Sequence, residues 1–478
     1  MNYSKLLTLG LSLCLCSGLW GQGKKSVIKH IEKNQENYKQ VAHKIWQYPE
    51  LGYQEEKSSA LLKSQLEAAG FSIESGVAGM PTSFVATYGS GGPTIGILAE
   101  YDALPGISQE NVPMRKVRIE GGAGHACGHH LFGTASVAAA IAVKDWLADS
   151  KTPGTIKLFG TPAEEGGAGK VYMVRAGLFD EIDAVLHWHP GDGNGASATS
   201  SLANKSAKFR FKGIASHAAS APQFGRSALD GVEAMNFMVN LMREHVDSDS
   251  RIHYVITKGG EAPNVVPEFA EVFYYVRHPK TEECRDNFER VVNAAKAAAL
   301  GTDTKMEYEV IHGLFNLQPN ETLSKVVHAN LSEIGGISYD ADEMTFAENI
   351  RESLPTKARK DLTSIQDVAP FQVIERGRGG STDVGDVSWV VPTAGLRTAT
   401  WVPGTSAHTW QAVAAGGMSI GHKGMLLAAK TIATSAVDLF NNPEVVEKAK
   451  RELMQRRGDE FKYMPLLGDR EPPLDYRK

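Results

Sequence analysis

The chain has 478 residues, of which 42% are hydrophobic and 22% are charged, and its formal net charge is −5. This composition is typical of a globular protein, and the length allows more than one domain with a sizeable core. Because the chain is slightly acidic and has no long basic stretch, we expect no nucleic-acid partner.

The N-terminus combines a basic residue, a short apolar stretch and small residues. Lys5 precedes LLTLGLSLCLCSGLW, and GQGKK follows. The stretch is too short to span a membrane, and its order is that of a secretory signal peptide. We therefore expect residues 1–23 to be a cleaved signal peptide, the mature chain to be periplasmic or secreted, and no membrane association after cleavage. A buried N-terminal helix is the alternative.

Cleavage would remove Cys14 and Cys16 and leave Cys127 and Cys284 as the cysteines of the mature chain. Two cysteines in an exported chain of this size do not make a disulfide framework. In an oxidising compartment, a cysteine is better explained if a bound metal protects it. A disulfide between Cys127 and Cys284 is the alternative.

Strands and helices alternate in the first part of the mature chain. Apolar spacing predicts amphipathic helices over 25–48 and 55–69, and FVATYG and TIGILAEYDAL predict strands. The second strand is almost wholly apolar and is expected to be central, with Glu100 and Asp102 on one side at its end. With the later strands TIKLFG and AVLHWHP, the pattern predicts a doubly wound α/β domain whose site lies at the carboxyl edge of the sheet.

The pattern changes after about residue 202. The segments from AKFRFKGIAS to KMEYEVIHG follow in the order strand, helix, strand, strand, helix, strand. This order predicts an inserted ferredoxin-like α+β domain over 204–313, which divides the doubly wound domain into 24–203 and 314–478. Residues 340–380 are charged and show no clear period, so we expect an irregular insertion or lid there.

The segment 121–132, GGAGHACGHHLF, is rich in potential metal ligands. His125, Cys127 and His129 occupy alternate positions, and His130 follows at once. The glycines allow tight turns and close approach to a ligand, and Cys with His favours zinc- or manganese-like ions over calcium or magnesium. One Cys with nearby His is not a complete site, so the alternative is a glycine-rich turn with a buried Cys and surface His.

Residues of ligand type also stand at the predicted strand ends: Cys127, His129, Glu164, Glu165, His187, His189 and His408. Two divalent ions need bridging and terminal ligands of these types. Side chains of the adjacent Glu164 and Glu165 diverge if both are extended, so one can bind metal while the other transfers protons. The alternative for this pair is an acidic helix N-terminus.

Other catalytic motifs receive little support. GGAGK at 166–170 lacks the first glycine of the phosphate-loop spacing, and Val follows its Lys where Ser or Thr is needed. The serine-hydrolase motif G-x-S-x-G does not occur in the sequence. A Cys127 nucleophile with a His base is possible, but it leaves the Glu pair and the distant histidines without a role.

Three polar residues of the inserted domain form a further candidate set. His217 lies in GIASHAASAP, Asn264 in GGEAPNVVPE, and Arg277 ends a strand in YYVRHP. One by one, each is more often a solvated surface residue. Together they would supply an oxyanion donor and a clamp for a carboxylate.

Several motifs in combination resemble a known family: PELGYQEE, YDALPG, GHACGHH, GTPAEEGGAGK, LHWHP, GIASHAA, GGEAPNVVPEFAEVFYYVR, GSTDVGDVSW and TSAHTW. The chain resembles, over nearly all of its mature length, the aminoacylase/carboxypeptidase-G family of binuclear metallohydrolases. The branch is similar to the amidohydrolases that include indole-acetyl-amino-acid hydrolases.

The resemblance implies two divalent metal ions per subunit, zinc or manganese, held by Cys127, His129, Glu165, His189 and His408. It implies that Glu164 is the general base that activates the metal-bridging water, with Asp102 behind the ligands. It also implies a homodimer, formed edge strand to edge strand through the inserted domain.

The same resemblance assigns the inserted-domain residues. His217 is expected to donate to the oxyanion from the partner subunit, and Asn264 and Arg277 to hold the substrate carboxylate. Two positions depart from the family. His130 stands where Asp or Asn is commoner, and Glu100 stands where other branches have a ligating His, so we leave Glu100 outside the ligand set.

We therefore expect a metal-dependent amidohydrolase that cleaves the amide between an acyl or aroyl group and an amino acid with a free carboxylate, such as glutamate. A metal-dependent dipeptidase or exopeptidase on the same scaffold is the second enzyme class. An exported metal-binding protein without catalysis is the third alternative. The Glu164–Glu165 pair argues against it, because binding alone does not need a base.

Overall fold

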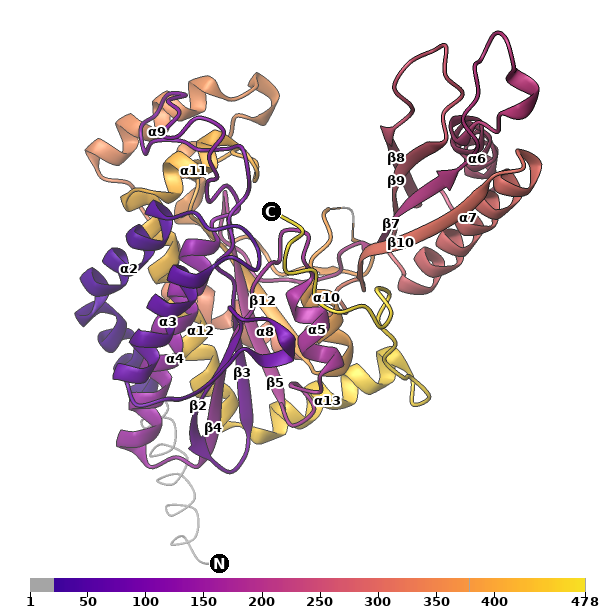
Figure 1. Ribbon diagram of the computed structural model, residues 1–478. Coiled ribbons are helices and arrows are strands. Elements are labelled where there is room, and N and C mark those ends of the chain that lie inside the picture. The colour runs from indigo at the N-terminus through magenta and orange to yellow at the C-terminus, as the bar shows by residue number, and fades with distance from the viewer. Residues whose placement is uncertain (1–20, 378, 478) are drawn as a thin grey trace, which may run out of the picture.

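The structure is a computed structural model that describes residues 21–377 and 379–477. Its larger part is built around one mixed sheet, and a smaller part projects from one side (Figure 1). The predicted fold class, a doubly wound α/β domain with an inserted ferredoxin-like domain, is confirmed. The predicted signal peptide lies outside the described residues except for 21–23, and it stays a prediction.

The main sheet has six strands in the order β1-β2-β4-β3-β5-β12. They are β1 (Ser72–Ser75), β2 (Phe84–Ser90), β3 (Thr94–Ala99), β4 (Gly154–Gly160), β5 (Ala184–Gly191) and β12 (Thr393–Ala399). The strands β4, β3, β5 and β12 are parallel, whereas β2 pairs antiparallel with both β4 and β1. As the sequence predicts, β3 is central, and Ile95, Ile97 and Leu98 are fully buried. Parallel strands bring their carboxyl ends to one edge, which positions the site.

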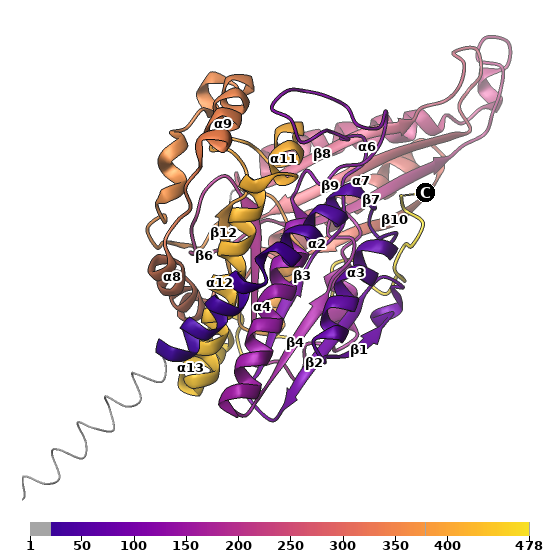
Figure 2. The ribbon, with the colours of Figure 1, turned by 90° about the vertical axis from the view of Figure 1, so that its left-hand side faces the viewer.

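Helices cover both sides of this sheet. One side carries α2 (Gln35–Gln47), α3 (Glu56–Ala68), α4 (His129–Ser150) and α12 (Ser419–Asn441), as Figures 1 and 2 both show. The short helices α5 (Gly169–Arg175) and α10 (Val384–Val390) pack together on the other side. At the β12 edge lie α8 (Glu321–Ile334) and α13 (Pro443–Arg457). The predicted helix over 25–48 is interrupted at Asn34, which separates a helical segment over 21–33 from α2.

The helix α4 is the core of this arrangement. All its residues from 129 to 143 are buried, and it contacts β3, β4 and β5 as well as α2, α3 and α12. By length and composition alone it could cross a membrane, and it is the one such helix among the described residues. Its burial inside the protein explains the apolar composition instead.

The inserted domain has its own sheet and core. Its antiparallel sheet has the order β10-β7-β9-β8. The strands are β7 (Ala203–Lys212), β8 (Arg251–Lys258), β9 (Phe269–His278) and β10 (Lys305–Leu314). The helices α6 (Ala228–Met242) and α7 (Thr281–Gly301) connect them, and the short 3₁₀ turns Pro222–Phe224 and Arg243–His245 flank α6. This is the ferredoxin-like order, and it leaves β8 and β10 as edge strands.

The prediction of irregular structure over 340–380 is wrong for the first part of this segment, which is helical. The helix α9 (Ala341–Ser353) begins with a capping box between Asp340 and Glu343. Its buried Phe346 and Ile350 belong to a small core with Trp401. The 3₁₀ turns Thr356–Ala358 and Leu362–Gln366 follow, and β11 (Val373–Ile374) pairs with β6 (Ala198–Thr199). The nearby α11 (Trp410–Gly416) and the 3₁₀ turn Val77–Gly79 complete the elements.

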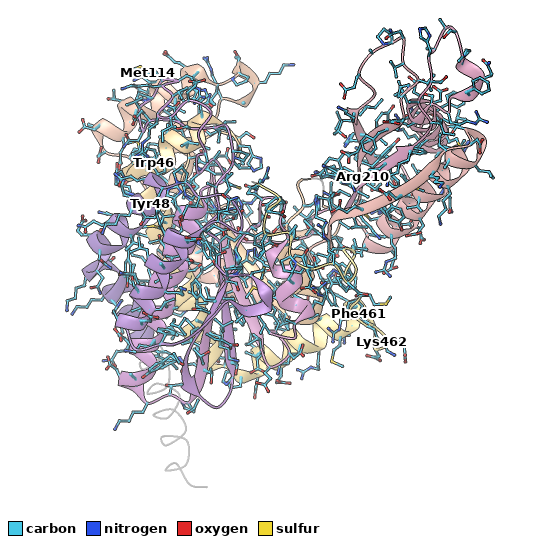
Figure 3. All side chains as sticks on the ribbon, viewed as in Figure 1. Trp46, Tyr48, Met114, Arg210, Phe461 and Lys462 are labelled. Carbon is cyan, nitrogen blue, oxygen red and sulfur yellow. The ribbon has the colours of Figure 1, made fainter. Side chains whose placement is uncertain are left out.

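After α13, residues 458–477 run back over the surface and end between the two parts of the molecule (Figure 1). We call this segment the strap. Figure 3 shows its Phe461 and Lys462 beyond the end of α13, whereas Arg210 lies on the inserted domain. Leu466 and Leu467 of the strap are buried.

Candidate metal centre

Potential metal ligands meet at the carboxyl edge of the main sheet. Within each of three groups, one atom per residue lies within 4.8 Å of the others, and the groups are Cys127–His129–His189, Cys127–Glu165–His408 and Glu100–His129–Glu164. The first two groups together contain all the predicted ligands, and they share Cys127. Side chains of these types, in two groups with one residue in common, could hold two neighbouring divalent cations.

The local backbone presents these side chains. Gly128, at the N-terminus of α4, has φ +79, and a Cβ at this position would lie 2.8 Å from Pro190. Glycine therefore allows the turn that places Cys127 and His129 on either side of it. His408 also has a left-handed backbone, with φ 62, and its N–H donates to the Ala126 carbonyl at 2.9 Å. Such a conformation for a non-glycine residue is typical of a functional position.

The rings of the two predicted histidine ligands on α4 and β5 are fixed by their Nδ1 atoms. His129 Nδ1 lies 2.8 Å from Asp102 Oδ1, and His189 Nδ1 lies 2.7 Å from the Pro190 carbonyl oxygen. Each Nδ1 therefore carries the donated hydrogen, which leaves Nε2 as the atom that can bind a metal. His189 Nε2 lies 3.4 Å from Cys127 Sγ.

Several buried atoms at this edge have no hydrogen-bond partner among the described residues: Glu100 Oε2, His129 Nε2 and Glu165 Oε1. His408 Nε2 lies 3.1 Å from Glu165 Oε1, and Glu100 Oε2 lies 3.1 Å from His129 Nε2, but neither pair has the geometry of a hydrogen bond. Buried polar atoms without partners are unfavourable unless a ligand satisfies them. Divalent cations would do so, and the donor set of thiolate, imidazole and carboxylate fits zinc or manganese.

Burial and neighbouring carboxylates shift the pKa values of the side chains at the candidate metal centre. Burial raises the pKa of the Glu164 carboxyl well above its usual range, and the carboxylates of Glu100, Glu165 and Asp383 add to this effect. Burial likewise raises the pKa of the Cys127 thiol, and Glu165 raises it further. A thiolate here therefore needs a compensating cation, which favours a metal ligand over a free cysteine nucleophile.

A buried lysine was missed by the sequence analysis. Lys170 Nζ lies 2.7 Å from Glu100 Oε1 and 2.7 Å from Asp383 Oδ1, and all three side chains are at most 1% exposed. The Lys170 N–H also donates to Asp383 Oδ2 at 2.9 Å. The residue is visible in the sequence as the Lys of the GGAGK segment, but that segment was compared only with the phosphate-loop spacing. The structure also places Glu100, which we left outside the ligand set, in contact with His129.

The other histidines of the segment face elsewhere. His125 Nε2 lies 3.1 Å from the Ile45 carbonyl oxygen, and His130 Nε2 lies 2.9 Å from that of Gly416. Burial lowers the pKa of His125 to about 3 and that of His130 well below its usual range. Both are therefore neutral rings that hold the segment in place. His187 belongs to none of the three ligand groups.

Two of the three inserted-domain residues, His217 and Asn264, lie away from the ligands of their own chain. His217 and Asn264 are exposed, in loops that Figure 1 shows at the end of the inserted domain away from the main sheet. They lie together, because the Ala218 N–H donates to the Asn264 carbonyl oxygen at 3.0 Å. Arg277 lies over the Tyr275 ring at 5.4 Å, and its buried Nε has no partner among the described residues. Their predicted roles stay predictions.

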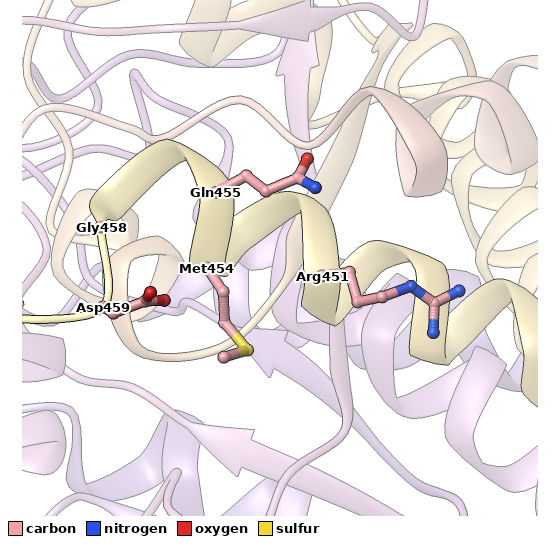
Figure 4. Close-up of a pocket in the computed structure, with 5 residues that line it drawn as sticks. All are labelled: Arg451, Met454, Gln455, Gly458 and Asp459. Carbon is pink, nitrogen blue, oxygen red and sulfur yellow. The ribbon is translucent and has the colours of Figure 1, made fainter.

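A hollow on the outside of α13 is separate from this centre. It is lined by Arg451, Met454, Gln455, Gly458 and Asp459, and Figure 4 shows these side chains on one helix and the turn after it. It contains none of the ligand-type residues described above.

Comparison with known proteins decides the family. Residues 96–409 match the peptidase family M20/M25/M40. The chain belongs to this family. The M20 family assignment confirms the resemblance seen in the sequence and makes the protein a hydrolase of amide bonds.

Among M20 relatives, the chain is 41% identical over 449 residues to one of the subunits of p-aminobenzoyl-glutamate hydrolase of Escherichia coli, covering 89% of this chain and 93% of that one. It is 30% identical over 447 residues to Xaa-Arg dipeptidase of Mus musculus, covering 90% and 91%. A dinuclear metal-binding M20 peptidase from Bacillus subtilis has the same fold, with a TM-score of 0.60, 17% identity, and coverage of 86% and 99%.

Proposed function

We propose that the protein is a binuclear metallo-amidohydrolase that releases an amino acid with a free carboxylate from an N-acyl or N-aroyl amino acid, such as aminobenzoyl-glutamate. The observation that carries this proposal is the pair of ligand groups that share Cys127, with Glu164 beside them. The substrate class follows from the 41% identity to the p-aminobenzoyl-glutamate hydrolase chain of Escherichia coli.

The metal ligands are Cys127, His129, Glu165, His189 and His408, and zinc or manganese fits their donor types. When bound, divalent ions would polarise the substrate carbonyl and lower the pKa of a bound water. Cys127 is the residue common to the two groups, and each of the other four ligands belongs to one of them. Asp102 orients this set, since its carboxylate contacts His129 and also accepts the Glu165 N–H at 2.8 Å.

Glu164 is the general base and then the general acid. Its half-buried carboxylate takes a proton from the attacking water and later gives it to the nitrogen of the departing amine. The neighbouring Glu165 faces His408 instead.

His217 is the oxyanion donor and acts on the site of a partner subunit. Its Nδ1 accepts the N–H groups of Ala219 and Ser220 at 3.2 and 3.1 Å, so Nε2 carries a hydrogen. Nε2 is then free to donate to a negatively charged oxygen. Asn264, beside it, and Arg277 hold the substrate carboxylate.

A second copy of the chain is the proposed partner, bound through the inserted domain. The edge strand β8 is largely exposed, with Val255 56% exposed, and α6 exposes Phe237 at 65% and Leu241 at 57%. An exposed edge strand with apolar neighbours is a surface that pairing would cover. We also propose export, on the signal-peptide pattern of residues 1–23; N-terminal sequencing of the mature protein tests it.

A dipeptidase is the second candidate, because the chain is 30% identical to Xaa-Arg dipeptidase over 90% of its length. The test is hydrolysis of p-aminobenzoyl-glutamate and of an arginine dipeptide by purified protein of measured metal content. We expect two ions per chain and preferred release of glutamate, with Glu164→Gln as the inactive control. Preferred cleavage of the dipeptide would favour the second candidate, and full activity of metal-free protein would contradict both.

A further inference from the structure

The strap connects the inserted domain to the metal centre. Near its middle, Arg470 donates to the carbonyl oxygens of Val310 and, at 2.8 Å, Ile311 on β10. Arg175 on α5 donates to the carbonyl oxygens of Gly468 and Arg470 at 3.1 and 2.7 Å. The strap is therefore attached to both parts of the molecule before it reaches the active-site edge.

The last described residues of the strap lie on a predicted metal ligand. Tyr476 Oη donates to the Glu165 carbonyl oxygen at 3.2 Å, and Arg477 Nη2 donates to the same oxygen at 2.8 Å. The Tyr476 ring packs edge to face on Tyr53 with centroids 5.7 Å apart. A Cβ built at Gly166 would lie 3.6 Å from Arg477 Nη2. The guanidinium of Arg477 therefore lies directly beside the Glu164–Glu165 turn.

Arg477 carries a charge that no described carboxylate neutralises, and the same holds for Arg277. The two cations lie over rings on different segments: Arg277 is over Tyr275 of β9 at 5.4 Å, and Arg477 is over Tyr476 of the strap at 4.9 Å. Burial raises the pKa of Tyr275, and the charges of Arg277 and Arg477 both oppose this rise. By contrast, Arg470 has Glu309 at 3.3 Å. Partly buried guanidinium groups without a carboxylate are suited to bind an anionic ligand.

From these contacts we infer that Arg477 is a substrate-binding residue, which holds the side-chain carboxylate of a dicarboxylic amino acid while Arg277 holds its α-carboxylate. This inference rests on the proposed function and narrows it to N-acyl derivatives of glutamate or aspartate. The Glu165 carbonyl uses one N–H of Arg477, so further N–H donors of the guanidinium remain for a bidentate contact.

The experiment compares kcat/KM for p-aminobenzoyl-glutamate and p-aminobenzoyl-glutamine, which differ only in the charge of the side chain. For Arg477→Gln, kcat/KM should fall at least about tenfold with the glutamate substrate. With the glutamine substrate it should stay within about threefold of the wild-type value. The variant's metal content should equal that of the wild type. Arg477→Lys should retain part of the preference for glutamate. The matched control is Lys462→Gln, an exposed cation of the same strap, which should leave both rates unchanged.

Equal losses on both substrates would overturn the inference, because Arg477 would then act only by holding the Glu165 carbonyl. No loss on either substrate would overturn it too. A wild-type enzyme that hydrolyses N-acyl amino acids without preferring glutamate over glutamine contradicts the inference alone. A wild-type enzyme that hydrolyses no N-acyl amino acid contradicts the proposed function itself.

Discussion

His129 Nδ1 lies 2.8 Å from Asp102 Oδ1, and both side chains are fully buried. The other oxygen of Asp102 accepts the backbone N–H of Glu165 at 2.8 Å. One carboxylate thus fixes the ring of one predicted ligand and the backbone of another. Because Nδ1 donates to Asp102, Nε2 is the atom of His129 that remains to bind a metal.

The first prediction follows from this contact. Asp102→Asn should weaken metal binding by about 10–100-fold, because the ring of His129 loses its carboxylate partner. Competition with a chelator measures the affinity. Asp149→Asn, an exposed acid on the same helix as His129, is the control and should bind metal as the wild type does. An Asp102→Asn variant with wild-type affinity would show that the contact does not tune the ligand.

The second prediction concerns the buried ammonium of Lys170. Lys170→Met should lower the free energy of unfolding by about 3–5 kcal/mol, because it leaves two carboxylates buried without a cation. The control is Lys325→Met, which removes a surface ion pair with Glu321 and should change the free energy of unfolding by less than about 1 kcal/mol. Urea unfolding of metal-free protein measures both. The double variant with Asp383→Asn should recover part of the lost stability. If Lys170→Met is as stable as Lys325→Met, this account of the buried ammonium is wrong.

The third prediction is a pH dependence of stability in the inserted domain. His312 lies between Asn204 and Ser206, each 3.0 Å away, and burial followed by Arg277 and Arg470 lowers its pKa to about 4. In the unfolded chain it takes up a proton near pH 6.5, so the unfolded state binds more protons between about pH 6.5 and 4. Stability is therefore lost as the pH falls through this window.

The measurement is the pH dependence of the unfolding free energy between pH 6 and 5. His312→Gln should reduce the slope of the wild type by about 1.4 kcal/mol per pH unit, the contribution of one proton. His245→Gln, at an exposed histidine of the same domain, should leave the slope as it is. If His312→Gln and wild type show equal slopes, His312 is not the titrating group.

The fourth prediction is that two chains complete one active site. His217 and Asn264 are exposed on the inserted domain and do not reach the ligands of their own chain. Mixing inactive His217→Ala chains with inactive Glu164→Ala chains should restore part of the activity, because one site of each mixed dimer is intact. Absence of recovery, with subunit exchange shown by a mass-tagged chain, would mean that His217 does not act on a partner.

Sequence patterns predicted the central strand of the main sheet and the edge at which the candidate ligands lie. The apolar TIGILA segment is the central β3, and the predicted ligands follow strands or turns whose ends meet at one edge. This succeeded because parallel strands must bring their carboxyl ends together, so residues distant in sequence become neighbours without knowledge of side-chain packing.

Two features could not be predicted in the same way: the buried ion pairs of Lys170 and the helix α9. Glu100, Lys170 and Asp383 pair only because α5 packs against α10, and nothing in a single sequence connects a lysine to acids so far away. The helix α9 was missed because its charged residues outnumber the few apolar ones that pack on Trp401. Its capping residues Asp340 and Glu343 were the local signal that could have revealed it.

The most direct test of the account separates the adjacent glutamates. Metal stoichiometry and kcat are measured for Glu164→Gln and Glu165→Gln with p-aminobenzoyl-glutamate as substrate. Glu164→Gln should keep two ions per chain and lose at least about 10²–10⁴-fold in kcat, because only proton transfer is removed. Glu165→Gln should bind metal more weakly, with partial recovery in excess metal. If Glu164→Gln loses metal while Glu165→Gln keeps it, the roles are reversed, and if neither variant changes rate or metal content, the metallo-amidohydrolase account is contradicted.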